Sequence, residues 1–101
     1  MTQADAVFSA LADPTRRSIF EHVAAHGSIT ASAIAAEVPV SRQAVSKHLA
    51  SLGDAGLVTK ERVGREVQYS ATPGPLTDVM AWVADVGSVW DARLERLREM
   101  F

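Results

Sequence analysis

The stretch from Ser41 to Val58, SRQAVSKHLASLGDAGLV, predicts a short helix that ends in a glycine-rich turn. Ser41 is a favourable N-cap, because its hydroxyl can accept a hydrogen bond from a free N–H group of the first turn. An apolar stripe follows at helical spacing and consists of Val45, Leu49 and Leu52. Gly53 and Gly56 weaken the helix, and either can adopt the left-handed conformation that ends it.

The opposite face of this segment carries hydrogen-bond donors, two of them positively charged: Arg42, Gln43, Ser46 and Lys47. A short helix with one buried face and long donors on its first turns has the form of a helix that reads the major groove of DNA. An ordinary amphipathic helix with a solvated polar face is the alternative. The flanking sequence decides between the two.

The preceding residues predict the first half of a helix-turn-helix. We expect a helix over Ala31–Val38 that is capped by Thr30 or a neighbouring residue and broken by Pro39-Val40. Its inward residues are Ile34, Ala35 and Val38. Two short helices joined by a tight turn form this motif, which we place at residues 31–54.

Two more helices are expected before it. The first runs from Ala4 to Ala12, and Asp13-Pro14 starts the second with an N-cap and a proline at the first helical position. The stripe of the second helix consists of Ile19, Phe20, Val23 and Ala24. Gly27 ends it, and Ser28–Thr30 is short and prone to form a strand.

The hydrophobic period changes after Gly56. Residues 57–62 and 66–70 read as two strands around Val63-Gly64-Arg65, which predicts a hairpin with glycine at its turn. A basic hairpin directly after a helix-turn-helix is the wing of a winged helix, here at residues 57–70. Arg62 and Arg65 would lie near its tip, within reach of a phosphate or the minor groove.

A last helix follows the boundary at Thr72–Pro75. Leu76–Met100 would be ~37 Å long, more than a domain of this size can cover, so its apolar side needs a partner. A twofold copy of the same chain is the expected partner. The residues assigned to this interface are Val7, Phe8, Leu11, Val79, Trp82, Val83, Val86, Trp90, Leu94 and Leu97. The alternative is that Trp82 and Trp90 are core aromatics of the monomer.

At 101 residues the chain is expected to form one domain, residues 1–101, with a modest core. The expected fold is mainly α with a small β-hairpin wing (α+β), and residues 75–100 form the dimerisation helix. The sequence contains no cysteine, which excludes disulfides and thiolate metal sites. We expect a cytoplasmic protein without membrane contact, since neither a signal peptide nor a run of ~20 apolar residues is recognisable.

The net charge of −2 argues against nucleic acid, but its distribution argues for it. Residues 1–40 carry two bases and four acids, and residues 71–101 carry three bases and five acids, a net −2 in each case. Residues 41–70 carry five bases and three acids, a net +2. The positive charge is therefore gathered around the expected reading helix and wing, and local potential matters more than the total.

Four segments, in order and spacing over nearly the whole chain, resemble the ArsR family of winged-helix transcriptional regulators. They are LADPTRRSIF at 11–20, VSRQAVSKHLASL at 40–52, AGLV at 55–58 and GREVQY at 64–69. The resemblance implies a homodimeric DNA-binding protein, usually a bacterial repressor of an imperfect palindrome. It also implies that the first and last helices build the dimer interface.

The sequence departs from the metal-sensing members of that family. Those members place Cys-x-Cys on the helix before the reading helix, or Asp and His ligands on the last helix. Ala31–Glu37 contains neither Cys nor His. The last helix offers carboxylates without His, at Asp78, Asp85 and Asp91. Carboxylates alone suit zinc, nickel or cobalt poorly.

One other pair of metal-ligating side chains is present. His22 and His26 lie four residues apart on one helix face, but two imidazoles lack the third ligand that a site needs. The sequence therefore predicts no metal and no cofactor, and it identifies no effector.

We expect two reading helices to enter successive major grooves of double-stranded DNA, about 34 Å apart. Arg42 suits the paired acceptors of guanine, and Gln43 suits adenine. Ser46 and Lys47 can touch bases or phosphates. Phosphate contacts are expected from Ser41, Thr30, Lys60, Arg62, Arg65 and Gln68.

Three further positions have roles that the sequence leaves more open. His48 lies beside the buried stripe, which favours packing or phosphate contact over base reading. Tyr69 is expected to pack under the wing. Arg16 and Arg17 can either reach DNA or form a structural ion pair.

Two other classes of function predict different properties. A winged helix used as a protein-interaction module would present its basic face to an acidic partner and show no sequence-specific DNA binding. An enzyme is not expected, because the sequence offers no set of nucleophile, base and oxyanion donors.

Overall fold

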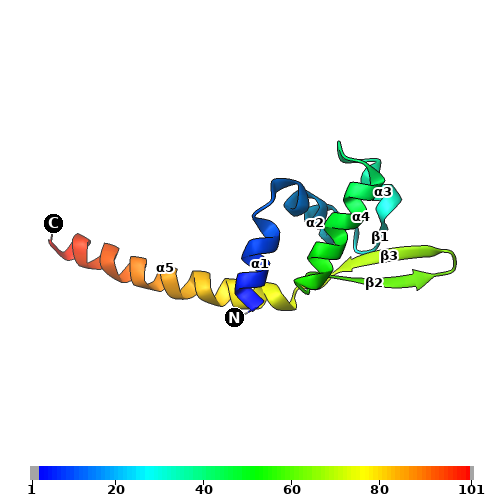
Figure 1. The fold of residues 1–101 in the computed structure, drawn as a ribbon. Coiled ribbons are helices and arrows are strands. Elements are labelled where there is room, and N and C mark those ends of the chain that lie inside the picture. Colours follow the sequence, from blue (N-terminus) through cyan, green and yellow to red (C-terminus); the bar gives the residue numbers. More distant parts are fainter. Residues whose placement is uncertain (1–2, 101) are drawn as a thin grey trace.

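The computed structural model describes residues 3–100, and Figure 1 shows a helical body from which a hairpin and a long helix project in opposite directions. Residues 1, 2 and 101 of the predicted domain lie outside the described residues. The elements are α1 (Gln3–Leu11), α2 (Pro14–His26), β1 (Ile29–Thr30), α3 (Ala31–Ala35), α4 (Arg42–Asp54), β2 (Val58–Val63), β3 (Glu66–Ala71) and α5 (Gly74–Met100). The predicted α+β winged helix is confirmed.

Local sequence signals set the ends of α2. The Asp13 carboxylate accepts hydrogen bonds from the backbone N–H groups of Thr15 at 2.9 Å and Arg16 at 3.3 Å, so it caps the helix as predicted. Gly27 ends the helix with a φ of 76° and donates its N–H to the carbonyl of Val23.

The pKa of Asp13 lies below its ordinary value of 3.8, first because of the Arg16 N–H hydrogen bond, with smaller contributions from Thr15, His48 and the Arg16 charge. A carboxylate whose pKa is lower in the folded protein stabilises the fold at pH values above its unfolded-state pKa. This stabilisation is lost as the pH falls through the folded-state pKa. Replacing Asp13 with alanine is therefore expected to lower the melting temperature at neutral pH, with a difference that shrinks below about pH 4.

Thermal unfolding followed by circular dichroism at neutral and at acid pH measures this difference. Asp13→Asn is the matched control, because its amide oxygen still accepts the capping bonds while carrying no charge. An alanine variant that melts with the wild type at neutral pH would show that the cap contributes nothing.

The helix-turn-helix has a shorter first helix than predicted. We expected Ala31–Val38, but α3 ends at Ala35, where the N–H of Glu37 turns back to the carbonyl of Ile34 at 2.9 Å. Pro39 explains the early end, because it disfavours helical backbone at Val38 and has no N–H to donate to the carbonyl of Ala35, four residues earlier. Val38 still packs against the core, as predicted.

The second helix, α4, begins and ends as its sequence indicates. The Ser41 hydroxyl accepts the N–H of Ala44 at 3.1 Å. Of the two candidate glycines, Gly56 takes the left-handed conformation, with a φ of 77°. The N–H of Leu57 then closes on the carbonyl of Leu52 at 2.9 Å, a Schellman-type end that turns the chain into β2.

The three strands form one antiparallel sheet in the order β1-β3-β2. In the hairpin, Val63 pairs with Glu66, so the turn consists of Gly64 and Arg65. Gly64 has a φ of 64°, which suits the first central position of a tight hairpin turn. Ile29 pairs with Tyr69 and thereby fixes the wing to the body.

The core joins the stripes of α2, α3 and α4 with the start of the sheet. Its fully buried side chains are Val7, Ile19, Val23, Ile34, Val45, Leu49, Leu52 and Leu57. Val7 corrects the predicted dimer interface: it is 1% exposed and belongs to the core of its own chain, so it has no surface to offer a partner.

Helix α5 starts at Gly74, one residue before the predicted 75–100, because the buried Pro75 suits a first helical turn. Leu76 and Val79 pack against the body, and α1 lies against this first part of α5 (Figure 1). The rest of the helix runs away from the body, and the molecule reaches 64 Å along its longest axis.

Candidate nucleic-acid interface

The first two turns of α4 present polar side chains on the side of the helix that faces away from the core. Ser41, Arg42, Gln43 and Lys47 are exposed, and Ser46 is half-buried. Val45, Leu49 and Leu52 hold the opposite side in the core. The predicted separation into a buried stripe and a donor face is therefore present.

A groove of about 350 Å³ lies between α3, the start of α4 and β3. Two guanidinium groups line it, those of Arg42 and Arg65, together with the hydroxyls of Thr30, Ser32 and Ser46. The groove thus combines the reading helix and the wing in one surface that carries two guanidinium charges and one carboxylate, that of Glu66. Guanidinium and hydroxyl donors suit phosphate oxygens and base edges.

Ser32 is a residue of this groove that the sequence analysis missed. Its Oγ accepts a hydrogen bond from Nε of Arg42 at 2.8 Å. An exposed serine ten residues before the arginine follows no sequence pattern, so only the packing of α3 beside α4 reveals it.

On the wing, Lys60, Arg62 and Arg65 are exposed as predicted. Nε of Arg62 donates to the carbonyl of Gly64 at 3.3 Å, which folds this side chain over the turn. Gln68 is half-buried, and its Oε1 accepts the Ser28 hydroxyl at 2.8 Å. Gln68 therefore fastens β3 to the corner before β1, which leaves its amide nitrogen as the group for the phosphate contact predicted for it.

Residues 41–70 carry five exposed basic side chains: Arg42, Lys47, Lys60, Arg62 and Arg65. Within residues 3–100 none of them pairs with a carboxylate, because the ion pairs of the described chain involve Arg16, Arg98 and two histidines. Exposed, unpaired cations concentrated in one segment favour binding to a polyanion.

His48 lies on the packed side of α4. It is half-buried. This position is compatible with the packing or phosphate role expected for it, and that role stays a prediction. Tyr69 is also partly buried against the core, under the wing as predicted.

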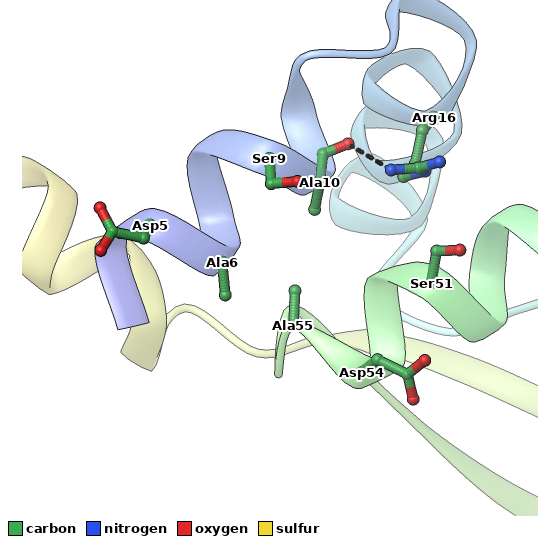
Figure 2. Close-up of a pocket in the computed structure, with 8 residues that line it drawn as sticks. All are labelled: Asp5, Ala6, Ser9, Ala10, Arg16, Ser51, Asp54 and Ala55. Carbon is green, nitrogen blue, oxygen red and sulfur yellow. Dashed lines mark hydrogen bonds between the residues drawn. The ribbon is translucent and has the colours of Figure 1, made fainter. Parts of the chain in front are cut away.

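Arg16 and Arg17 turn towards α1. Nη1 of Arg16 donates to the carbonyl of Ala10 at 3.4 Å, and Nη1 of Arg17 donates to the carbonyl of Leu11 at 2.8 Å. Figure 2 shows the Arg16 guanidinium directed at Ala10, at the edge of a pocket of about 390 Å³ between α1, α2 and α4. Both arginines thus cap the free carbonyls at the end of α1. Arg16 also lies 4.0 Å from Asp13, which is an ion pair of the kind expected for the structural role.

The histidine pair of α2 faces Glu37. Nδ1 of each ring is 2.8 Å from a backbone carbonyl, which can only accept and so requires a proton on Nδ1. Nε2 of His22 and of His26 face different Glu37 oxygens, at 3.3 and 3.6 Å. No group of three or more His, Asp or Glu side chains in residues 3–100 could hold a metal ion. The cluster is an ion-pair contact between α2 and the α3–α4 turn when the rings are protonated.

The predicted dimer residues other than Val7 lie on or near the surface of α1 and α5. Leu11 and Val79 are half-buried, and Phe8 is 43% exposed with its ring edge-on to Trp82 at 5.5 Å. Trp82 and Trp90 are 53% and 57% exposed, so neither is a core aromatic of the single chain. The remaining residues on α5 are also exposed: Val83, Val86, Leu94 and Leu97.

None of the described helices is long and apolar enough to span a bilayer.

Comparison with known proteins places this arrangement among transcription regulators. Residues 11–61 match a helix-turn-helix domain family. The chain is 39% identical over 90 residues to the HTH-type transcriptional regulator Rv2034 of Mycobacterium tuberculosis, covering 89% of this chain and 80% of that protein. It is 35% identical to the transcriptional repressor SdpR of Bacillus subtilis, covering 76% and 84% of the two chains.

A solved structure has the same fold over nearly the full length. The ArsR-like transcriptional regulator from Rhodococcus sp. RHA1 superposes with a TM-score of 0.78 at 37% identity, over 97% of this chain and 92% of that one. Sequence, helix-turn-helix and wing agree, and the chain belongs to the ArsR family of winged helix-turn-helix transcriptional regulators, which bind DNA.

Proposed function

We propose that the protein is a homodimeric repressor that binds an imperfect palindrome in double-stranded DNA. The observation that carries this proposal is the shared groove, in which Arg42 of the reading helix and Arg65 of the wing present their charges on one face. The name of the related SdpR supports repression. Its site of action would be the cytoplasm, where bacterial DNA is found.

The dimer in this proposal is supported by the apolar side of α5. Val83, Val86, Trp90 and Leu97 recur at spacings of three, four and seven residues and are all exposed. A continuous apolar stripe on a free helix favours association with another helix. A twofold axis would then present both reading helices to one face of the duplex, about 34 Å apart.

The first experiment is a binding titration with the DNA upstream of the protein's own gene against random DNA, at two salt concentrations. Selective binding by a dimer supports the repressor. Weak binding that is equal on both DNAs and falls steeply with salt would place the operator elsewhere. No binding by a folded dimer would favour the protein-interaction alternative.

Replacing Arg65 with alanine is expected to weaken binding to all DNA sequences alike. The side chain lies at the wing tip, where it would neutralise one phosphate and release one counterion. The slope of log affinity against log salt should therefore become shallower by about one for each wing. Titrations at several salt concentrations on operator and random DNA measure the slope.

Arg96→Ala removes an exposed positive charge from α5 and serves as the matched control. It should leave the salt slope unchanged. A loss confined to the operator for Arg65→Ala would contradict the phosphate role and point to base contact.

A further inference from the structure

The hydrogen bond from Arg42 to Ser32 connects the two helices of the helix-turn-helix. Arg42 is the first residue of α4 and is exposed, and its Nε lies 2.8 Å from Oγ of Ser32, the second residue of α3. A guanidinium has five N–H donors, and this bond uses only the one on Nε. Both terminal nitrogens remain available in a planar fork.

Within residues 3–100, the Ser32 hydroxyl forms no side-chain hydrogen bond other than the one with Arg42. The N-cap of α3 is Thr30, whose Oγ1 accepts the N–H of Ala33 at 3.1 Å. Ser32 itself is exposed, so α3 folds without needing its side chain.

A serine at position 32 binds Arg42 without neutralising its positive charge. A carboxylate in the same place would orient the guanidinium but also neutralise it. Glu66 lines the same groove, yet Arg42 forms no ion pair with it or with any other carboxylate in the described chain. The hydroxyl fixes the direction of the side chain and leaves its full positive charge for a ligand.

We propose that Ser32 is a positioning residue that holds Arg42 so that its terminal fork meets two acceptors of one guanine in the major groove. This inference rests on the proposed DNA-binding function. A free arginine loses much rotamer freedom when it binds, and a side chain already held by Ser32 loses less. Ser32 thus contributes to specificity through Arg42, without touching the base.

The test is a binding-site selection from random double-stranded DNA, followed by affinity measurements on the selected site and on its single-base variants. Wild type should prefer guanine at one position in each half-site, and Arg42→Ala should reduce that preference by about 5- to 150-fold. Ser32→Ala should reduce the preference at the same position by about 2- to 10-fold and leave the other positions unchanged.

Two controls separate positioning from folding. Ser32→Thr keeps a hydroxyl at this position and should retain the guanine preference. Ser88→Ala, at an exposed position of α5, should change nothing. The melting temperature of Ser32→Ala should equal that of the wild type.

Each other result overturns a definite part of the proposal. If wild type selects no sequence, the proposed function fails, and the role of Ser32 fails with it. If Arg42→Ala relaxes one position but Ser32→Ala does not, the function stands and Ser32 has no positioning role. A Ser32→Ala variant that weakens binding to every sequence equally, or that melts earlier, would assign Ser32 a structural role. If Arg42→Ala leaves the base preference unchanged at every position, Arg42 does not read a base.

Discussion

Replacing Arg42 with alanine is expected to lower the affinity for the operator by about 1–3 kcal/mol and to relax base preference at one position of each half-site. The reason is geometric, since Arg42 is the first residue of α4 and its terminal fork is free in an open groove. A bidentate contact to O6 and N7 of guanine depends on both terminal nitrogens, and alanine removes them together. Affinities for the operator, its single-base variants and random DNA measure the effect.

Arg62→Ala is the matched control for charge, because its Nε is turned back to Gly64 at the wing tip. This variant should lose affinity on operator and random DNA to the same extent. If Arg42→Ala shows that same uniform loss, Arg42 contacts only phosphate, and base reading must come from elsewhere on the helix, with Gln43 as the next candidate.

The sequence predicted the elements that depend on local signals. Asp13, Ser41 and Gly27 sit at helix ends because their side chains or backbone conformations satisfy the groups that a helix end leaves free. Gly64 marks the hairpin turn for a similar local reason. Each of these residues interacts with backbone groups only a few positions away, so these helix ends and the turn can be predicted from the local sequence.

The features that the sequence missed depend on tertiary neighbours. A helical stripe placed Val7 beside Phe8 on an apolar side, but it could not show that the core of the same chain covers Val7 while leaving Phe8 exposed. Arg16 and Arg17 donate hydrogen bonds to carbonyls of α1, six residues earlier in the chain. Ser32 accepts a hydrogen bond from Arg42 across the pair of helices α3 and α4. Sequence periodicity indicates which side of a helix is apolar or polar, and only the packing shows what meets it.

The candidate site was predicted in part. Its exposed basic residues were predicted, because the charge is concentrated in residues 41–70 and because four segments resemble a known family. The groove that brings Arg42 and Arg65 together requires the β1–β3 pairing, which places the wing beside α3 and α4. Strand pairing across forty residues of sequence is not a local property.

Replacing Trp90 with glutamate is expected to convert the proposed dimer into a monomer and to lower operator affinity by about 10²- to 10⁴-fold. Trp90 is 57% exposed and belongs to the stripe of α5 that runs beyond the body. The Arg93 guanidinium lies 5.6 Å from the centroid of the Trp90 ring, and more than half of the Trp90 side chain is exposed, so the monomer fold should persist. A twofold axis would bring two new carboxylates into one apolar interface, where burying unpaired charge is costly.

Sedimentation and circular dichroism measure the oligomeric state and the fold, and titrations on full and half operators separate dimer loss from damage to the reading helix. Affinity for a half-site should stay near that of a single wild-type head, because α4 and the wing are untouched. Ser88→Glu is the matched control: it adds the same charge two residues away, on the opposite, polar side of α5, and it should remain a dimer with full affinity. A Trp90→Glu variant that stays dimeric and binds the full operator normally would show that the exposed stripe of α5 is not the dimer interface, and the palindrome would then need another explanation.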